Sequence, residues 1–181
     1  MPYVVAALII LTVVCLLNLL LTFGIIRRLR GQSGGHHDVP EDLTLPAGAV
    51  VPEFTATTTA GGAVSRSTVS GGVIAFFSPG CGACEKQLPR FTDLARTLAG
   101  DEDTPVLAVL HGTMEETRDQ LAALSPVVEV VVEEPDDPIG TAFAVTGYPS
   151  FVVIDADGKI AATSYTLDRL PLPIVSAARA E

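Results

Sequence analysis

The sequence predicts an α/β domain with a mixed sheet flanked by helices, preceded by an N-terminal transmembrane helix. From Glu53 onward, apolar runs of strand length alternate with stretches whose apolar residues recur at helical spacing, which is typical of parallel strands joined by helices. Before this part, Val4 to Ile26 is a run of 23 residues without a charge. We therefore expect an anchor at residues 1–30, a linker at residues 31–50 and a folded domain at residues 51–181.

The uncharged run is long enough to cross a bilayer, because a helix of this length spans about 34 Å at about 1.5 Å per residue. Arg27, Arg28 and Arg30 follow the run, where a cleaved signal peptide would have small residues. The sequence thus predicts a single-pass membrane anchor that is not cleaved. Taken alone, the three arginines favour a cytoplasmic position for the domain by the positive-inside rule.

The segment after the anchor is strongly acidic. It carries all 21 acidic residues and eight of the eleven basic ones, so it repels phosphate backbones and we expect no nucleic-acid partner. In the linker, His36 and His37 have no cysteine or third histidine nearby, so we expect them to be solvated and predict no metal site. A charged, solvated loop is expected at Glu133, Glu134, Asp136 and Asp137.

The elements of the domain follow from its apolar pattern in chain order. Strand-forming residues on both sides of Gly61-Gly62 predict a hairpin within residues 53–65. The continuous apolar run from Gly72 to Ser78 is typical of a central strand covered on both faces. Helical spacing of apolar residues then predicts a helix that opens at Cys81 and stops at Gly100.

The second half of the domain repeats this alternation and ends in a hairpin. Its elements are, in order, a strand at 105–112, a helix at 113–126, a strand at 127–134, a short helix at 138–147, a hairpin that turns at Asp157-Gly158, and a last helix in the tail from Leu167. The helix after the second strand is expected to begin at Thr113, because its hydroxyl can cap the helix and Glu116 follows three residues later.

Cys81 and Cys84 form a C-x-x-C pair in "FFSPGCGACEKQLPRF", directly after the apolar strand. A structural disulfide over so short a loop would add little stability, and a zinc site would need a second pair that this chain lacks. At the start of a helix, free N–H groups and the helix dipole favour the thiolate of Cys81. The position therefore favours a redox pair, in which Cys81 attacks and the shielded Cys84 resolves the mixed disulfide. Structural and zinc roles stay open as alternatives.

Pro149, in "VTGYPSF", begins a predicted strand, a position that proline tolerates. A cis bond here would present the backbone of Tyr148 to a neighbouring site. Cis bonds are rare, however, so the residues alone favour an ordinary trans proline.

The run around the cysteines, followed at this distance by "GYPSFVVIDADGKI", resembles the thioredoxin superfamily. More narrowly, it resembles the membrane-anchored TlpA-like disulfide reductases, including the MauD group linked to methylamine dehydrogenase maturation. The resemblance covers about Val51 to Tyr165. It implies a thioredoxin-like fold with Cys81 as nucleophile, Cys84 as resolving thiol, Pro149 as a cis-proline facing them and Pro89 as a helix kink. It also implies chemistry through the redox-active cysteine pair, with no cofactor.

Two positions depart from that family. In that family a tryptophan often precedes the first cysteine. Here Gly80 stands at this position, so an aromatic side chain that would contact the substrate is missing. Gly80 and Tyr148 are the two residues expected to contact the substrate. Ala75 stands where thioredoxin has a buried acid. Proton transfer for Cys84 then needs water or another group such as Glu85, whose simpler role is that of a solvated residue in the first helical turn.

The resemblance implies a membrane-tethered thiol–disulfide oxidoreductase that exchanges disulfides with partner proteins and with an upstream electron donor or acceptor. Two other functions compete with it. One is a thioredoxin-fold assembly or binding module without turnover. The other is a peroxiredoxin-like peroxidase in which Ser78 assists peroxide binding, although Ile74 replaces the proline expected upstream. The resemblance also implies a location at the cell membrane with the domain extracytoplasmic, against the direction that the three arginines favour.

Overall fold

The computed structural model describes residues 3, 11–12, 14–16, 43–98, 104–134 and 137–171, in a chain that divides into two units, Met1–Val39 and Pro40–Glu181. The described residues of the first unit are helical and exposed. Within the described ranges, no helix combines the length and the apolar character needed to cross a bilayer. The expected span from Val4 to Ile26 lies outside these ranges except at 11–12 and 14–16, so the anchor stays a prediction. His36, His37 and the tail beyond Pro171 also lie outside them.

The second unit is organised around a five-stranded sheet in the order β5-β4-β3-β6-β7. The strands are β3 (Val73–Phe77), β4 (Val106–His111), β5 (Glu129–Glu133), β6 (Ser150–Ile154) and β7 (Ile160–Ser164). β3, β4 and β5 are parallel, while β6 and β7 pair antiparallel, so the predicted mixed sheet is confirmed. β3 is the middle strand, which agrees with its uninterrupted apolar sequence and with the burial of all its residues.

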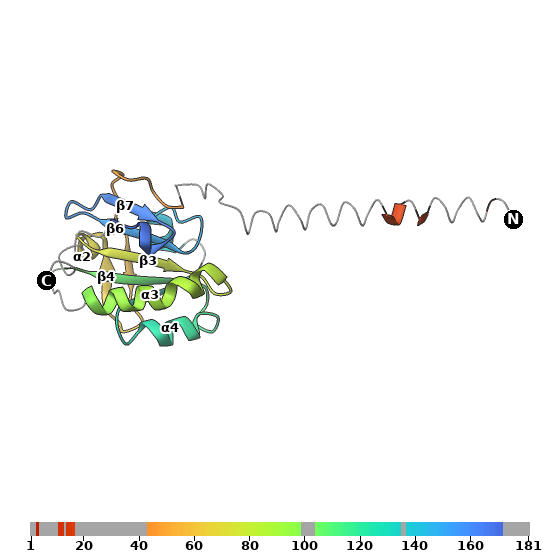
Figure 1. The fold of residues 1–181 in the computed structure, drawn as a ribbon. Coiled ribbons are helices and arrows are strands. Elements are labelled where there is room, and N and C mark those ends of the chain that lie inside the picture. The colour runs from red at the N-terminus through yellow and green to blue at the C-terminus, as the bar shows by residue number, and fades with distance from the viewer. Residues whose placement is uncertain are drawn as a thin grey trace. The chain divides into compact units, whose positions relative to one another are not determined.

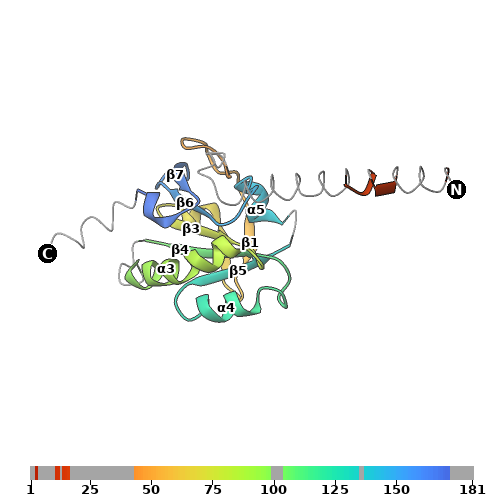
Figure 2. The same ribbon diagram turned by 45° about the vertical axis from the view of Figure 1, so that its right-hand side comes forward.

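Helices cover both faces of this sheet. They are α2 (Arg66–Val69), α3 (Gly82–Leu98), α4 (Arg118–Leu124), α5 (Pro138–Ala142) and the 3-10 helix η1 (Leu167–Arg169). Figure 1 shows α3 and α4 together on one side of the sheet, where α3 buries Cys84, Phe91 and Leu98. On the other face, α2 and α5 contribute Val69 and Ile139 to a second buried cluster. Figure 2 shows α5 well separated from α3 and α4.

The predicted hairpin forms, but as a sheet of its own. β1 (Thr55–Thr57) and β2 (Ala63–Ser65) pair antiparallel with each other and with no strand of the larger sheet. Phe54 and Val64 of this hairpin are buried in the cluster that also contains residues of α5. The hairpin therefore covers one face of the large sheet.

α4 begins later than the sequence predicts. Thr113 and Glu116 do make the expected capping contacts, because the N–H and the hydroxyl of Thr113 each donate to Glu116 Oε2 over 2.9 Å. The N–H of Glu116 donates back to Thr113 Oγ1 over 3.3 Å. These bonds close a turn at residues 114–117, and the regular helix starts only at Arg118. The capping box is confirmed, and the predicted helix start is wrong by about one turn.

Candidate active site

The turn between β3 and α3 carries the cysteine pair. Gly80 has a φ of +69°, a left-handed conformation that glycine adopts without a Cβ penalty, and α3 begins at Gly82. Cys81 and Cys84 are joined by a disulfide, with their Cα atoms 5.2 Å apart. Cys84 is fully buried, whereas Cys81 is partly exposed. The sulfur of Cys81 is therefore the one that a partner can reach.

Two backbone groups contact Cys81 Sγ. The N–H of Cys84 donates to it over 3.1 Å; this N–H belongs to the first turn of α3, where the helix itself offers no acceptor. The carbonyl oxygen of Tyr148 lies 3.6 Å from the same sulfur. A donor favours the anionic form of a sulfur, and a carbonyl oxygen favours the protonated form because it can accept the S–H. The site thus holds one group that favours each protonation state.

The sheet register brings Tyr148 and Pro149 to this turn. β3 and β6 are antiparallel with Phe76 opposite Ser150, so the residues just before β6 lie beside those just after β3. The bond between Tyr148 and Pro149 is cis. This agrees with the family resemblance and differs from the trans bond that the residues alone favoured. Strand pairing therefore explains why Tyr148 lies next to Cys81.

Three phenylalanines pack beneath the cysteine pair. Phe77 of β3 makes edge contacts with Phe91 of α3 and Phe151 of β6, with ring centroids 5.5 Å and 5.8 Å apart. Cys84 belongs to the same buried cluster. These rings attach α3 to the middle of the sheet, so the start of the helix has a defined place relative to β6.

His111 and Glu133 lie at the ends of β4 and β5, opposite each other in the parallel register. The ring of His111 stacks on the ring of Tyr148, with centroids 5.3 Å and planes 21° apart. The side chain of Glu133 is only 3% exposed. Its Oε1 accepts a hydrogen bond from the N–H of Ile139 (2.8 Å) and its Oε2 from the N–H of Gly140 (2.9 Å). Burial raises the pKa of Glu133 from its ordinary value, while these two bonds oppose that shift.

The burial of Glu133 corrects the expectation of a solvated loop. Glu133 is the last residue of β5, whereas the neighbouring Glu134 is exposed and Asp136 lies outside the described residues. No local signal in "VVEVVVEE" distinguishes Glu133 from Glu134, because the difference arises only when α5 closes over the end of β5. Burial also raises the pKa of the Tyr148 hydroxyl, and the charge of Glu133 adds to that effect.

The other predicted positions lie where the sequence places them. Ala75 is fully buried in β3, so that strand offers no carboxylate. Glu85 is exposed in the first turn of α3, where its N–H donates to the carbonyl of Cys81 over 3.1 Å. Space beside Gly80 is open, since a Cβ built there would meet no atom within 4 Å. Among the described residues, no group of three His, Cys, Asp or Glu side chains could hold a metal ion.

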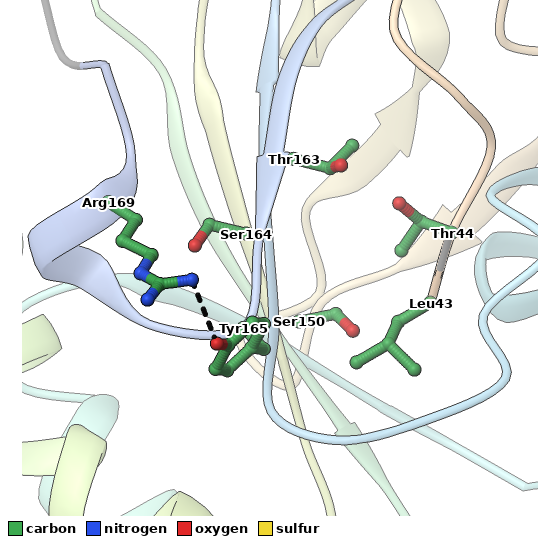
Figure 3. Close-up of a pocket in the computed structure, with 7 residues that line it drawn as sticks. All are labelled: Leu43, Thr44, Ser150, Thr163, Ser164, Tyr165 and Arg169. Carbon is green, nitrogen blue, oxygen red and sulfur yellow. Dashed lines mark hydrogen bonds between the residues drawn. The ribbon is translucent and has the colours of Figure 1, made fainter. Parts of the chain in front are cut away.

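A pocket of about 220 Å³ lies between β7 and the start of the second unit. Its described lining consists of Leu43, Thr44, Ser150, Thr163, Ser164, Tyr165 and Arg169. Figure 3 shows Arg169 directed toward Tyr165, and its Nη1 donates to the Tyr165 hydroxyl over 3.0 Å. This lining includes no cysteine and no carboxylate, so it offers no counterpart to the thiol chemistry of the turn before α3.

The sheet order, the helices on both faces and the disulfide at the start of α3 define a thioredoxin-like fold. The chain belongs to the AhpC/TSA family, whose model matches residues 47–163. Thioredoxin-like oxidoreductases work through a redox-active disulfide and need no cofactor, and here Cys81 and Cys84 form the C-x-x-C disulfide. No curated protein matches the sequence.

Solved structures share the fold. The thioredoxin domain of a thiol–disulfide oxidoreductase from Bacteroides vulgatus is 22% identical with a TM-score of 0.60, over 74% of this chain and 98% of that chain. A secreted disulfide oxidoreductase from Mycobacterium tuberculosis, homologous to E. coli DsbE, is 19% identical with a TM-score of 0.52, over 70% and 92%. A thiol:disulfide interchange protein of the thioredoxin family from Chlorobium tepidum is 19% identical with a TM-score of 0.53, over 66% and 86%. The predicted thioredoxin-like fold is confirmed.

Proposed function

We propose that this chain is a membrane-tethered thiol–disulfide oxidoreductase of the TlpA-like type, which exchanges disulfides with partner proteins. The observation that carries the proposal is the Cys81–Cys84 disulfide at the start of α3, with one sulfur accessible and the other buried. A thiol at a helix start meets unpaired N–H groups, which favour the reactive thiolate. The family match and the thioredoxin-like fold support the same class of reaction.

The proposed reaction moves two electrons in two steps. The Cys81 thiolate attacks one sulfur of a substrate disulfide, so that the substrate S–S bond breaks, a mixed disulfide forms and one substrate thiolate leaves and is protonated by water. The Cys84 thiolate then attacks Cys81 Sγ and releases the second substrate thiol. The substrate has been reduced and the Cys81–Cys84 disulfide restored, so an upstream dithiol must reduce the pair again. The reverse sequence oxidises a substrate dithiol.

Cys84→Ala should trap the intermediate of this reaction. Without the resolving thiol, full-length protein incubated with a fluorescent peptide that contains one disulfide is expected to retain the peptide through Cys81. A fluorescent band on a non-reducing gel, which disappears with reductant, reports the mixed disulfide. The double variant Cys81→Ser/Cys84→Ala is the matched control and should show no band. Both proteins carry Cys15→Ser, because the free, exposed Cys15 would otherwise compete for the peptide. A Cys84→Ala protein that retains no peptide while remaining folded by circular dichroism would rule out the proposed reaction.

The proposal places the domain on the extracytoplasmic side of the cell membrane, because protein disulfides persist in oxidising compartments. Arg27, Arg28 and Arg30 favour the opposite orientation. Alkaline phosphatase fused to the C-terminus, which is active only outside the cytoplasm, is therefore expected to be active. An inactive phosphatase fusion beside an active β-galactosidase fusion at the same position would reverse this orientation.

A further inference from the structure

Glu133 is a buried carboxylate that the two exchange steps do not use. A carboxylate removed from water needs hydrogen-bond donors, and α5 supplies two, the N–H groups of Ile139 and Gly140. Gly140 lies beside it, and a Cβ built there would make an ordinary van der Waals contact with Glu133 Oε2 at 3.7 Å. These contacts join the end of β5 to the start of α5, so Glu133 defines where that helix begins.

The segment that follows α5 leads to Tyr148 and is attached at both of its ends. Phe143, directly after the helix, is fully buried and contacts the ring of Phe76 with centroids 5.5 Å apart. At the other end, the Ser150 hydroxyl donates to the carbonyl of Gly147 over 2.7 Å. These two attachments connect the start of α5 to Tyr148 through a short stretch of chain.

Tyr148 is also held through its side chain. Its ring stacks on His111, and His111 is the register neighbour of Glu133. The charge of Glu133 contributes to the raised pKa of Tyr148, so these groups lie within electrostatic range of one another. Tyr148 thus connects His111 and Glu133 to Cys81, whose Sγ lies 3.6 Å from the Tyr148 carbonyl oxygen.

We propose that His111 and Glu133 are positioning residues for disulfide exchange, which hold the Tyr148 carbonyl oxygen beside Cys81 Sγ. This inference rests on the proposed function. In the disulfide, Cys81 Sγ lies near both the Tyr148 carbonyl oxygen and the N–H of Cys84. After reduction, we expect the S–H of Cys81 to donate to that oxygen, which favours the thiol, while the N–H of Cys84 favours the thiolate. When a substitution lets Tyr148 move away, Cys81 loses the contact with the carbonyl oxygen and keeps the one with the N–H of Cys84. The thiolate then forms at lower pH.

Other titratable groups also influence the pH at which the Cys81 thiolate forms, so their contribution must be separated from that of the Tyr148 carbonyl oxygen. Glu85 lies on α3 itself, while His111, Glu133 and Tyr148 come from β4, β5 and the residues before β6. Two substitutions at His111 distinguish the loss of its titratable group from the loss of its stacking ring. His111→Phe removes the titratable group but keeps a ring that can stack on Tyr148, whereas His111→Ala removes both.

The test measures alkylation of reduced Cys81 by iodoacetamide against pH, in full-length protein carrying Cys15→Ser so that the free, exposed Cys15 does not react. We expect His111→Ala to move the alkylation midpoint to lower pH, so that below the parent midpoint Cys81 is alkylated faster, by about three- to tenfold, the factor that corresponds to one lost aromatic contact. His111→Phe should restore both to near the parent values. An unchanged midpoint and rate in His111→Ala, or a His111→Phe protein that behaves like His111→Ala, would overturn the role of the stack.

Glu133→Gln tests the other positioning residue with little change in volume. The amide keeps one acceptor oxygen but turns an N–H toward one of the two donors of α5, so one hydrogen bond is lost. The alkylation midpoint is expected to move in the same direction as in His111→Ala. A midpoint equal to that of the parent would remove Glu133 from the proposal. If the parent itself does not reduce the peptide disulfide, the proposed function fails, and the midpoint series still decides whether Tyr148 is positioned in this way.

Discussion

Cys81→Ser is expected to lower the rate of thiol–disulfide exchange by about a thousandfold or more, as is typical when a nucleophile is removed. A serine hydroxyl forms no S–S bond and does not ionise near neutral pH, so the first step is lost. Cys81 is partly exposed, so the substitution removes little packing and the reduced protein should unfold near the wild-type temperature. The measurement is the reduction of a fluorescent peptide disulfide by full-length protein that has been reduced beforehand.

Two further cysteine variants serve as matched controls. Cys15 is a free cysteine in the first unit, far along the chain from the pair, and Cys15→Ser is expected to exchange at the wild-type rate. Cys84→Ser should complete the first step and stall before the second, so the peptide stays attached to the protein. Exchange at the wild-type rate in Cys81→Ser would contradict the role of Cys81 as nucleophile. An absence of exchange in the wild-type protein as well would favour an assembly or binding module without turnover.

The features that the sequence predicts well are those that a short stretch of chain determines. The apolar run of β3 identifies a strand buried on both faces, and the helical spacing after Cys81 identifies α3. The cysteine pair could be placed at a helix start for the same reason, because strand, turn and helix follow one another within a few residues. The start of α4 was missed although its signal is also local, because Thr113 and Glu116 cap a turn that precedes the regular helix.

The features that the sequence does not predict depend on strand register. The family resemblance implied that Pro149 faces the cysteines, but it did not imply that Tyr148 stacks on His111, which ends a different strand. Glu133 is buried because β5 pairs with β4 and α5 closes over its end. A single sequence does not state which residues face each other across a sheet. Cys81 could therefore be proposed as the nucleophile from the residues alone, whereas the places of His111 and Glu133 in the fold could not.

Phe77→Ala is expected to destabilise the domain by about 3–5 kcal/mol, the usual cost of removing a fully buried phenylalanine. Phe77 has no exposed surface, and its ring contacts Phe91 of α3 and Phe151 of β6. The cavity would open between the sheet and the helix that carries the cysteines. Urea denaturation followed by circular dichroism measures the change. The free energy of unfolding of such domains is about 5–15 kcal/mol, so the substitution removes a large part of the stability.

Met114→Ala is the control for the loss of an apolar side chain, because Met114 is 56% exposed and its truncation should cost less than about 0.5 kcal/mol. The loss of unfolding free energy in Phe77→Ala is expected to be similar in the oxidised and the reduced protein. The Cys81–Cys84 loop is too short for its disulfide to restrict the unfolded chain strongly. A loss below about 1 kcal/mol would contradict the packing described for this cluster.

The same substitution has a chemical consequence at the pair. Cys84 is fully buried and belongs to the cluster that Phe77 fills. With the ring removed, Cys84 gains room to move and is expected to react faster with iodoacetamide after reduction than it does in the wild type, while Cys81 reacts at a similar rate. Mass spectrometry of the alkylated peptides separates the two sites. Aromatic packing would then account for the division of roles, because it keeps Cys84 from solvent and leaves Cys81 as the sulfur that meets the substrate.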